Sequence, residues 1–361
     1  MSAALPAAAV EEPVRFRRRQ ESPASPAQPA LPGSGALVDG FGRVHADLRI
    51  SITDRCNFRC TYCMPEDGMP FSPPEELLTP AEIERVARAA RRLGVRGARV
   101  TGGEPLLRRD VVDIVERLAG VGFEDLALTT NAWRLARLAG ELRRAGLQRL
   151  NVSCDSLRPE RFAAIRRRGE LSRVLAGMDA AEAAGFPPPK VNVVLVAGVN
   201  DDEVLDFAAF ARRTGRPVRF IELMPLDADG AWSRQQVVPG RSVVAQIGAA
   251  WPLVALHVPG DPSPATRYRF ADGEGEIGII ASVTEPFCGT CDRLRLTADG
   301  AVRNCLFSDD ERPLRQLLRH GASDDELEAE LRRSVGAKRA GHGIDEPGFL
   351  RPARTMSRIG G

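Results

Sequence analysis

Hydrophobic and polar positions along the chain repeat in two different periods. Short runs rich in Val, Ile and Leu are typical of β-strands, and longer stretches with an apolar residue every three or four positions are typical of amphipathic helices. The predicted strands cover residues 48–52, 98–101, 126–130, 149–153, 191–196 and 218–223, and the predicted helices cover 80–93, 110–119, 134–145, 160–184 and 202–213. This alternation predicts parallel strands joined by right-handed crossovers.

Six such units are too few for the closed eight-stranded barrel. We therefore predict an α/β fold with a partial (βα)6 TIM-like barrel over residues 41–240. Functional residues of such barrels gather at the carboxyl ends of the strands. The first predicted helix has a clear start, because Thr79 can cap it, Pro80 suits its first position and Glu82 completes a capping box.

The pattern changes after residue 240. Predicted strands at 268–270 and 276–281 precede a predicted hairpin of 294–296 and 302–306, whose turn lies at Asp299 and Gly300. From residue 311 onward the sequence is charged and helical in pattern. The segment 241–361 is therefore predicted to form a C-terminal β-containing domain.

Residues 1–40 are rich in Ala and Pro and contain a basic cluster at 15–19. This composition predicts a disordered extension of a cytoplasmic protein; an Arg-rich organellar presequence is the alternative. The net charge of +2 argues against a bulk nucleic-acid binder, and no apolar run approaches the ~20 residues of a membrane span. In a reducing compartment the cysteines favour metal ligation over disulfides.

Six of the seven cysteines form two triads, C-x3-C-x2-C at Cys56, Cys60 and Cys63, and C-x2-C-x13-C at Cys288, Cys291 and Cys305. The predicted hairpin brings Cys305 back beside Cys291. Each triad offers three thiolates, one fewer than a closed zinc site or an iron–sulfur cube requires. A cluster held by three cysteines leaves one iron free to bind another molecule, so the sequence predicts two reactive iron–sulfur centres.

Zinc is the alternative metal. His45 could complete a zinc knuckle with the first triad, or the second triad could belong to a zinc-ribbon interaction module fused to the barrel. Paired C-x2-C spacing is usual in zinc sites, and the C-x3-C spacing of the first triad argues against one. Cys154, the seventh cysteine, is predicted to be a buried free thiol.

A glycine-rich segment ends the second predicted strand. Gly102 and Gly103 would let backbone groups approach a ligand closely, and Glu104 offers an acceptor for an amine. Tyr62, next to Cys63, could pack its ring on a planar ligand or within the core.

Basic residues lie in or at the ends of predicted strands at Arg49, Arg99, Lys190, Arg219, Arg293 and Arg295. Side chains there can face the lumen of a barrel, and guanidinium groups suit phosphate oxygens. Any one of them could instead be an ordinary surface charge. Arg293 and Arg295 share one face of a strand.

The segment RCNFRCTYCMP at residues 55–65 resembles the signature of radical S-adenosylmethionine (SAM) enzymes, and TGGEP at 101–105 resembles their glycine-rich strand end. The segment FCGTCDRLR at 287–295 resembles the GTP 3′,8-cyclase family of molybdenum cofactor biosynthesis, and the resemblance covers residues 41–361. It implies two 4Fe–4S clusters, ligated by the two triads, and SAM. It further implies SAM contacts at Tyr62, Gly103, Ser153 and Met224, GTP contacts at Thr129 and the six basic residues, catalytic roles for Arg293 and Arg295, and entry of the Gly360-Gly361 tail into the active site.

The resemblance implies a lyase reaction. A 5′-deoxyadenosyl radical takes the ribose 3′ hydrogen of GTP, giving 3′,8-cyclo-7,8-dihydroguanosine 5′-triphosphate. It also implies a downstream cyclic pyranopterin monophosphate synthase and a reductant such as flavodoxin or ferredoxin, and it is compatible with a homodimer. A two-cluster radical SAM enzyme of the peptide-maturing type is the alternative, although such enzymes usually carry more C-terminal cysteines.

Overall fold

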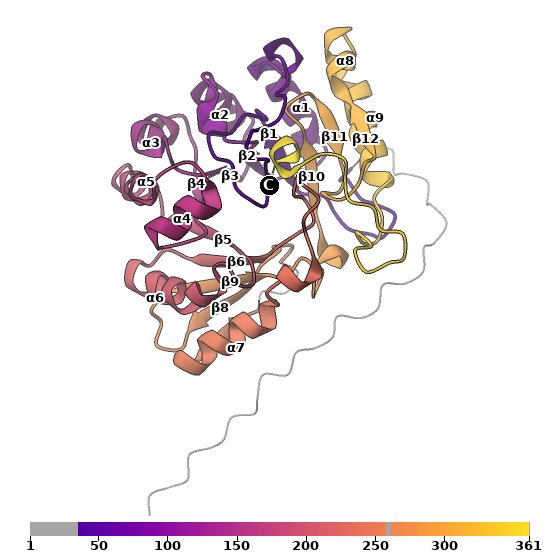
Figure 1. Cartoon of the computed structure of the whole chain (residues 1–361). Coiled ribbons are helices and arrows are strands. Elements are labelled where there is room, and N and C mark those ends of the chain that lie inside the picture. The colour runs from indigo at the N-terminus through magenta and orange to yellow at the C-terminus, as the bar shows by residue number, and fades with distance from the viewer. Residues whose placement is uncertain (1–34, 258–260, 361) are drawn as a thin grey trace, which may run out of the picture.

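The computed structural model describes residues 35–257 and 261–360, and within them the strands form one 12-stranded sheet surrounded by helices (Figure 1). The first half contains β1 (Asp47–Ser51), α1 (Pro80–Arg92), β2 (Gly97–Thr101), α2 (Val111–Gly120), β3 (Asp125–Thr130), α3 (Leu135–Arg144), β4 (Arg149–Ser153), α4 (Pro159–Arg166), α5 (Leu171–Ala183), β5 (Lys190–Leu195), α6 (Val204–Thr214) and β6 (Val218–Glu222). Strands β1 to β6 pair in chain order and run parallel. The predicted partial barrel is confirmed.

Side chains along each strand alternate between the inside of the barrel and the face that the helices cover. In β1, Leu48 and Ile50 are fully buried apolar residues, whereas Arg49 and Ser51 take the opposite face. The predicted capping box is present at the start of α1, since Thr79 Oγ1 accepts from the amide of Glu82 at 3.2 Å and Glu82 Oε2 accepts from the amide of Thr79 at 2.7 Å.

The single helix predicted over 160–184 is wrong, because the chain breaks there into α4 and α5. Arg167 takes a left-handed conformation with φ 55° and Gly169 one with φ 105°. A Cβ on Gly169 would lie 2.3 Å from Cε1 of Phe58. The break therefore lets α4 end against the loop that follows β1.

Beyond β6 the structure contains α7 (Gly240–Ala250), β7 (Leu253–Leu256), β8 (Thr266–Phe270), β9 (Glu276–Ile280), β10 (Arg293–Leu296), β11 (Ala301–Arg303), β12 (Glu311–Pro313), α8 (Leu314–Arg319), α9 (Asp324–Gly336) and α10 (Met356–Ile359). β9 pairs parallel with β6, and β10 pairs parallel with β1. Two C-terminal strands thus extend the parallel sheet at both of its edges, so the lumen is lined by eight parallel strands.

The predicted hairpin is present as β10 and β11, which run antiparallel around a turn that contains Gly300 with φ 82°. β7 and β12 were not predicted. The helical pattern assigned from residue 311 onward is wrong for β12, which pairs with β11, and correct for α8 and α9. No helix in the described part of the chain is both long and apolar enough to cross a bilayer.

Residues 35–40, which the sequence assigned to a disordered extension, pack against the barrel. Leu37 is buried, its amide donates to the carbonyl oxygen of Leu93 at 3.2 Å, and its own carbonyl accepts from the amide of His45 at 2.7 Å. The predicted extension therefore ends too late; the rest of it, residues 1–34, lies outside the described residues.

Candidate active site

The first cysteine triad, Cys56, Cys60 and Cys63, lies on the loop that leaves the carboxyl end of β1. The amides of Cys63 and Met64 both donate to the carbonyl oxygen of Cys60, at 2.9 and 3.1 Å, and so close a tight turn. Burial raises the pKa of the Cys56 thiol to about 12, and the nearby Cys60 adds to this effect. Burial, Cys60 and Cys56 also raise the pKa of Cys63. The three sulfur atoms thus share one water-poor site, where a bound cation would favour the thiolates.

A buried cation touches this triad. Nη1 of Arg166 donates to Sγ of Cys60 at 3.0 Å, and Nη2 lies 2.8 Å from Oδ2 of Asp155. The hydroxyl of Tyr62 donates to the same carboxylate oxygen at 2.6 Å. Although burial disfavours the charge of Arg166, Asp155 and Cys60 hold its pKa above the usual value. Sequence reasoning missed Arg166 because a charge on a predicted helix normally faces solvent. It missed Asp155 because that residue lies between a predicted strand and a predicted helix, outside both.

Gly102 and Gly103 at the end of β2 are required by the backbone of the first-triad loop. A Cβ on Gly102 would lie 2.3 Å from the carbonyl oxygen of Thr53, and one on Gly103 would lie 2.4 Å from that of Arg55. The amide of Gly103 donates to the Thr53 oxygen at 2.7 Å. These glycines therefore allow the strand end and the triad loop to touch, and their close approach to a ligand stays a prediction.

Glu104 already accepts three hydrogen bonds in the folded protein. Its carboxylate accepts from the amide of Leu106 at 3.0 Å, the hydroxyl of Thr130 at 2.7 Å and the amide of Asn131 at 2.6 Å. Burial raises the pKa of Glu104 to about 7 although these three hydrogen bonds lower it. Glu104 thus ties the end of β2 to the end of β3, and its role as an amine acceptor stays a prediction.

The residues implied to contact SAM lie at the carboxyl end of the parallel strands. Tyr62 is on the loop after β1, Gly103 follows β2, Ser153 ends β4 and Met224 follows β6. This is the end at which the first triad lies. Their contacts with SAM stay a prediction.

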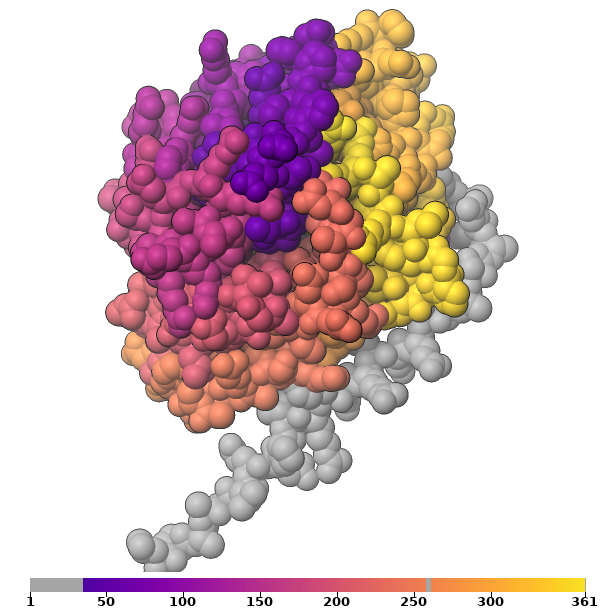
Figure 2. All heavy atoms as spheres, in the orientation of Figure 1, coloured from indigo at the N-terminus to yellow at the C-terminus, as the bar shows by residue number. Residues whose placement is uncertain are grey.

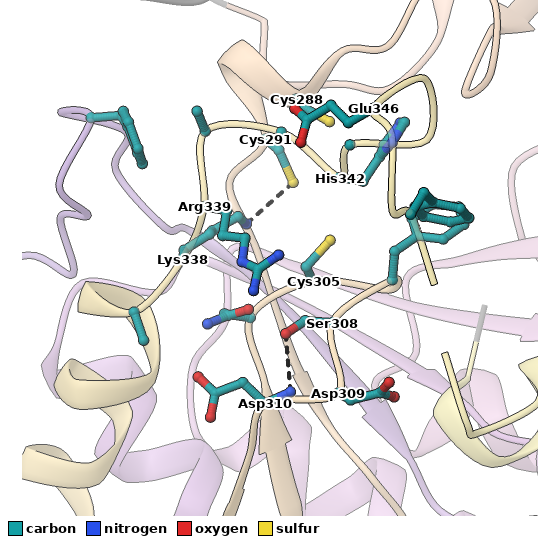
Figure 3. Close-up of a pocket in the computed structure, with 18 of the residues that line it drawn as sticks. Cys288, Cys291, Cys305, Ser308, Asp309, Asp310, Lys338, Arg339, His342 and Glu346 are labelled. Carbon is teal, nitrogen blue, oxygen red and sulfur yellow. Dashed lines mark hydrogen bonds between the residues drawn. The ribbon is translucent and has the colours of Figure 1, made fainter. Parts of the chain in front are cut away.

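The second cysteine triad, Cys288, Cys291 and Cys305, lies at the opposite end of the barrel (Figure 3). Cys291 precedes β10, which runs parallel to β1 with Arg293 opposite Asp47. The first triad follows the far end of β1, so at least this five-residue strand separates the two sites, on the order of 16 Å at ~3.3 Å per residue. The expectation that function gathers at the carboxyl strand ends is correct for the first triad and wrong for the second.

The hairpin brings Cys305 to the other two cysteines, as predicted. Cys305 and Cys291 lie close enough to Cys288 to raise its pKa further, after burial. They line a cavity of about 1060 Å³ together with residues 336–343 and 346–350. The cavity makes this triad more open than the first.

Two cations hold the second triad. Nζ of Lys338 lies 3.3 Å from Sγ of Cys291 and donates to the carbonyl oxygen of Arg293 at 3.0 Å. Nη1 of Arg43 donates to the carbonyl oxygen of Cys288 at 2.7 Å. Burial alone would raise the pKa of Cys291, but the charges of Arg293 and Lys338 lower it, whereas burial raises that of Cys288. Within the triad, Cys291 is thus the thiol whose thiolate form the protein favours most clearly.

Glu222 at the end of β6 fixes the segment that leads into Cys288. Its carboxylate accepts from the amides of Gly240 at 2.9 Å, Val283 at 2.8 Å and Thr284 at 2.8 Å, and from the Thr284 hydroxyl at 2.5 Å. Four donors satisfy a carboxylate completely. The sequence analysis did not predict that Glu222 anchors this segment.

The predicted basic residues meet inside the barrel between the two triads. Burial and neighbouring cations lower the pKa of Lys190 to about 8, of Arg295 to about 9 and of Arg219 to about 10. Burial and Arg49 also lower the pKa of Arg99. We call the cations on the lumen-lining strands β1, β2, β4, β5, β6 and β10 the basic cluster: Arg49, Arg99, Arg149, Lys190, Arg219, Arg293 and Arg295.

Arg149 was missed by the sequence analysis, although it begins a predicted strand. It pairs with Asp125, and Asp47 pairs with Arg49 at 2.8 Å. Arg293 also lies over the ring of Phe287, 4.6 Å from its centroid. The basic cluster therefore has more cations than carboxylates, a costly arrangement in a buried site unless an anion binds there.

Uncharged polar groups line the same lumen between the basic cluster and the carboxyl strand ends. Among the described residues, the Thr129 hydroxyl, both side-chain polar atoms of Asn151 and Oδ1 of Asn192 are buried with no hydrogen-bond partner. In the sheet, Thr129 lies opposite Asn151 and Asn151 opposite Lys190. Thr129 was a predicted GTP contact, whereas Asn151 and Asn192 were missed; their period-two spacing from Arg149 and Lys190 could have revealed them.

The C-terminal turn enters this lumen. Gly360 adopts φ 81°, and a Cβ there would lie 2.7 Å from Cγ2 of Thr101 and 3.2 Å from Cβ of Ser51. In the preceding turn Ser357 and Ile359 are buried, and Arg358 donates to the carbonyl oxygen of Pro70 at 2.5 Å. Other parts of the C-terminal segment, yellow in Figure 2, lie at the surface. The tail thus enters as the resemblance implied, although Gly361 lies outside the described residues.

The proposed zinc ligand His45 is engaged elsewhere. Its Nε2 lies 3.0 Å from Oδ2 of Asp39, and it is close enough to Lys338 for that charge to lower its pKa further, after burial. Among residues 35–257 and 261–360, no three His, Cys, Asp or Glu side chains are arranged to hold a single metal ion. Cys154 is a buried free thiol, as predicted.

Comparison with known proteins decides the family. A Radical SAM superfamily model matches residues 50–211, and a Molybdenum Cofactor Synthesis C model matches residues 217–344. A GTP 3′,8-cyclase of Corynebacterium glutamicum is 46% identical over 344 residues, covering 92% of this chain and 91% of that protein. One of Rhodopirellula baltica is 50% identical over 331 residues, covering 90% and 92%. The chain belongs to the GTP 3′,8-cyclase family.

Solved structures share the fold of this GTP 3′,8-cyclase family member. Streptococcus suis SuiB bound to S-adenosylmethionine has a TM-score of 0.56 at 12% identity, covering 80% of this chain and 68% of that one. Native anSMEcpe with bound AdoMet has a TM-score of 0.51 at 13% identity, covering 85% and 92%. Both support the partial barrel.

The family is one of radical SAM lyases in molybdenum cofactor biosynthesis, and its cofactors are 4Fe–4S clusters and SAM. The two cysteine triads fit the 4Fe–4S clusters, because each triad places three thiols in a largely buried site with a cation in contact with one sulfur. Three thiolates leave one iron open for a further ligand.

Proposed function

We propose that this chain converts GTP to 3′,8-cyclo-7,8-dihydroguanosine 5′-triphosphate with GTP held in the lumen between the two triads. The single observation that carries the proposal is the basic cluster, which lies between two incomplete cysteine sites at opposite ends of β1 and β10. A triphosphate supplies the negative charge that this cluster lacks. Arg49, Arg99, Lys190, Arg219, Arg293 and Arg295 bind its oxygens, and Thr129 contacts the nucleotide.

Cys56, Cys60 and Cys63 hold the first cluster. When bound there, the cluster and SAM supply the 5′-deoxyadenosyl radical that takes the hydrogen from the ribose 3′ carbon. Tyr62, Gly103, Ser153 and Met224 position SAM at the carboxyl strand ends, above the lumen. The hydrogen bond from Tyr62 to Asp155 fixes the ring next to Cys63.

Cys288, Cys291 and Cys305 hold the second cluster, whose open iron is available to guanine. Arg293 and Arg295 act as catalytic residues that contact the nucleotide from β10. The ribose 3′ carbon–hydrogen bond breaks and the bond from that carbon to guanine C8 forms. One electron and one proton then complete the dihydro product. The lumen keeps the sugar and base in the arrangement that this ring closure needs.

The proposed reaction implies a cellular location and partner proteins. We propose a cytoplasmic location, a downstream cyclic pyranopterin monophosphate synthase and a flavodoxin- or ferredoxin-type reductant, with a homodimer as the compatible assembly. The basic cluster is enclosed by the barrel, which supports a small anion rather than nucleic acid as its ligand.

The test is an anaerobic assay of the reconstituted protein with GTP, SAM and a strong reductant, with the product identified by mass. About eight irons per chain are expected for two cubes. Cys305→Ala should abolish cyclisation and leave part of the SAM cleavage, because its first triad is untouched. Cys154→Ala is the matched control and should keep both activities. Zinc in place of iron and sulfide, or full cyclisation by Cys305→Ala, would refute the proposal.

A further inference from the structure

Lysine occupies two positions in this chain, 190 and 338, among 50 basic residues. Lys190 belongs to the basic cluster in the lumen. Lys338 lies just beyond α9, is 5% exposed, and has no part in the triphosphate site. A buried ammonium group that substrate binding does not explain needs another reason.

The contacts of Lys338 point to the second triad. Its ammonium nitrogen lies 3.3 Å from Sγ of Cys291 and 3.0 Å from the carbonyl oxygen of Arg293, the first residue of β10 (Figure 3). One side chain thus holds a cysteine sulfur and the strand end beside it. A compact ammonium with rotatable donors can reach both.

Lys338 at the second triad and Arg166 at the first triad differ in whether a carboxylate balances their charge. Arg166 also touches a cysteine sulfur, but Asp155 lies 2.8 Å from it and balances its charge. Within the described residues, no carboxylate lies within ion-pair distance of Lys338; the nearby Arg43 pairs with Asp39 at 2.6 Å. Of the two cations that touch a cysteine sulfur, Arg166 is thus paired with a carboxylate and Lys338 is not.

An iron–sulfur site becomes more negative when it accepts an electron, and charge beside its sulfur ligands is one of the factors that set its reduction potential. A buried ammonium next to a thiolate stabilises the more negative, reduced state, because there is little water to screen the charge. A cation already balanced by a carboxylate has a much smaller effect.

We propose that Lys338 is a positioning residue that fixes Cys291 and raises the reduction potential of the second cluster. The inference rests on the proposed second cluster and adds the residue that tunes it. Lys338 acts through the sulfur of Cys291 and does not touch GTP. The second cluster is consequently easier to reduce than it would be without this charge.

The test uses the full chain carrying Cys56→Ala, Cys60→Ala and Cys63→Ala, which leaves the second triad alone. Iron is counted, and the potential is measured by a reductive titration followed by electron paramagnetic resonance without GTP or SAM. Lys338→Met removes charge and donors, Lys338→Gln keeps a donor without the charge, and Lys338→Arg keeps the charge. Lys190→Met is the control, since it removes the other lysine, which contacts neither triad in the described structure.

The background protein should hold about four irons per chain. The potential should shift to more negative values in Lys338→Met and Lys338→Gln, and should stay near the background value in Lys338→Arg and Lys190→Met. Loss of iron from the two neutral variants with retention in Lys338→Arg would equally support the role of the charge.

Equal potentials in all four variants would overturn the inference, as would a shift in Lys338→Arg as large as that in Lys338→Met. Loss of iron from all three Lys338 variants would also overturn it, because side-chain fit and not charge would then be decisive. A background protein that holds no iron would refute the proposed second cluster itself, which separates that failure from failure of the inference.

Discussion

Nη1 of Arg295 donates a hydrogen bond to the carbonyl oxygen of Gly360 at 2.6 Å, which joins β10 to the last turn of the chain. Both residues are buried. The partner is a neutral carbonyl, so this contact leaves the charge of Arg295 without compensation, and burial and Arg49 lower its pKa to about 9. The C-terminal turn thus orients a cation of the basic cluster without neutralising it.

Replacing Gly360 by Ala should therefore impair cyclisation. The backbone of Gly360, at φ 81° and ψ 124°, is in a region that costs a residue with a side chain about 1–3 kcal/mol, and the new Cβ would lie 2.7 Å from Thr101. The turn must shift, and Arg295 with it, so we expect a fall of about tenfold or more in the rate of product formation. Product mass measured over time in the anaerobic assay checks this, with iron content expected to be unchanged.

Gly348→Ala provides the matched control. Gly348 also has a positive φ, 90°, but nothing lies within 4 Å of its Cβ position. It should lose far less activity than Gly360→Ala. Equal losses in the two variants would show that backbone strain in the tail, and not its contact with the lumen, limits the reaction.

Neutralising Asp155 should destabilise the protein strongly. Asp155→Asn leaves Arg166 as an unpaired cation, 4% exposed, beside Cys60. Removing one partner of a buried ion pair costs about 3–5 kcal/mol. Urea unfolding of the cluster-free protein measures the change in the free energy of unfolding.

The control for this variant is Asp206→Asn. Asp206 pairs with Arg158 at 2.9 Å, but the two side chains are 51% and 45% exposed, so the change should cost less than about 1 kcal/mol. Similar values for Asp155→Asn and Asp206→Asn would contradict the role given to Asp155.

Lys190 should make nucleotide binding depend on pH. Burial and the charges of Arg219 and Arg149 lower its pKa to about 8, and a bound triphosphate favours the protonated form. Affinity for GTP should therefore be highest below pH 8 and decline as pH rises through that value. A lost charged contact of about 1.5–3 kcal/mol corresponds to roughly tenfold or more in Kd. Anaerobic equilibrium binding of GTP without SAM, from pH 7 to 9, measures it.

Lys190→Arg separates this effect from that of the other cations, because an arginine at this position keeps its charge over the range. Its affinity should change little with pH, and Lys190→Met should bind weakly throughout. A decline of the same size in Lys190→Arg as in the parent protein would assign the titration to another group.

The sequence predicted most of the barrel because β1 to β6 alternate apolar and polar residues over the length of a strand. That periodicity shows that a strand exists but not which strand it pairs with. β10 lies beside β1 although more than two hundred residues separate them, and β9 lies beside β6. For that reason the sequence did not show that the second triad lies at the end of the barrel opposite the first.

In the candidate site, the roles of the cysteines and the lumen cations could be predicted from their residue types and spacing. Arg166, Asp155 and Lys338 were not, because their importance depends on what lies across the fold. A helical arginine is normally exposed, and here the break at Arg167 ends α4 against the first triad. The glycines at 102 and 103 were noticed, but the sequence could not show that the group they approach is the backbone of residues 53–55.

The anchoring role of Glu222 gives a prediction for the second triad alone. Glu222→Gln replaces one carboxylate oxygen with a donor that would face backbone amides, such as those of Gly240 and Val283. Each buried group left unsatisfied costs about 1–3 kcal/mol, so the segment leading to Cys288 should loosen. Iron should fall from about eight toward about four per chain, with SAM binding retained. Glu276 lies on the neighbouring strand β9, and Glu276→Gln, which breaks its partly exposed pair with Arg267 of β8, should keep its iron. Full iron in Glu222→Gln, or equal loss in both variants, would show that Glu222 does not position the second triad.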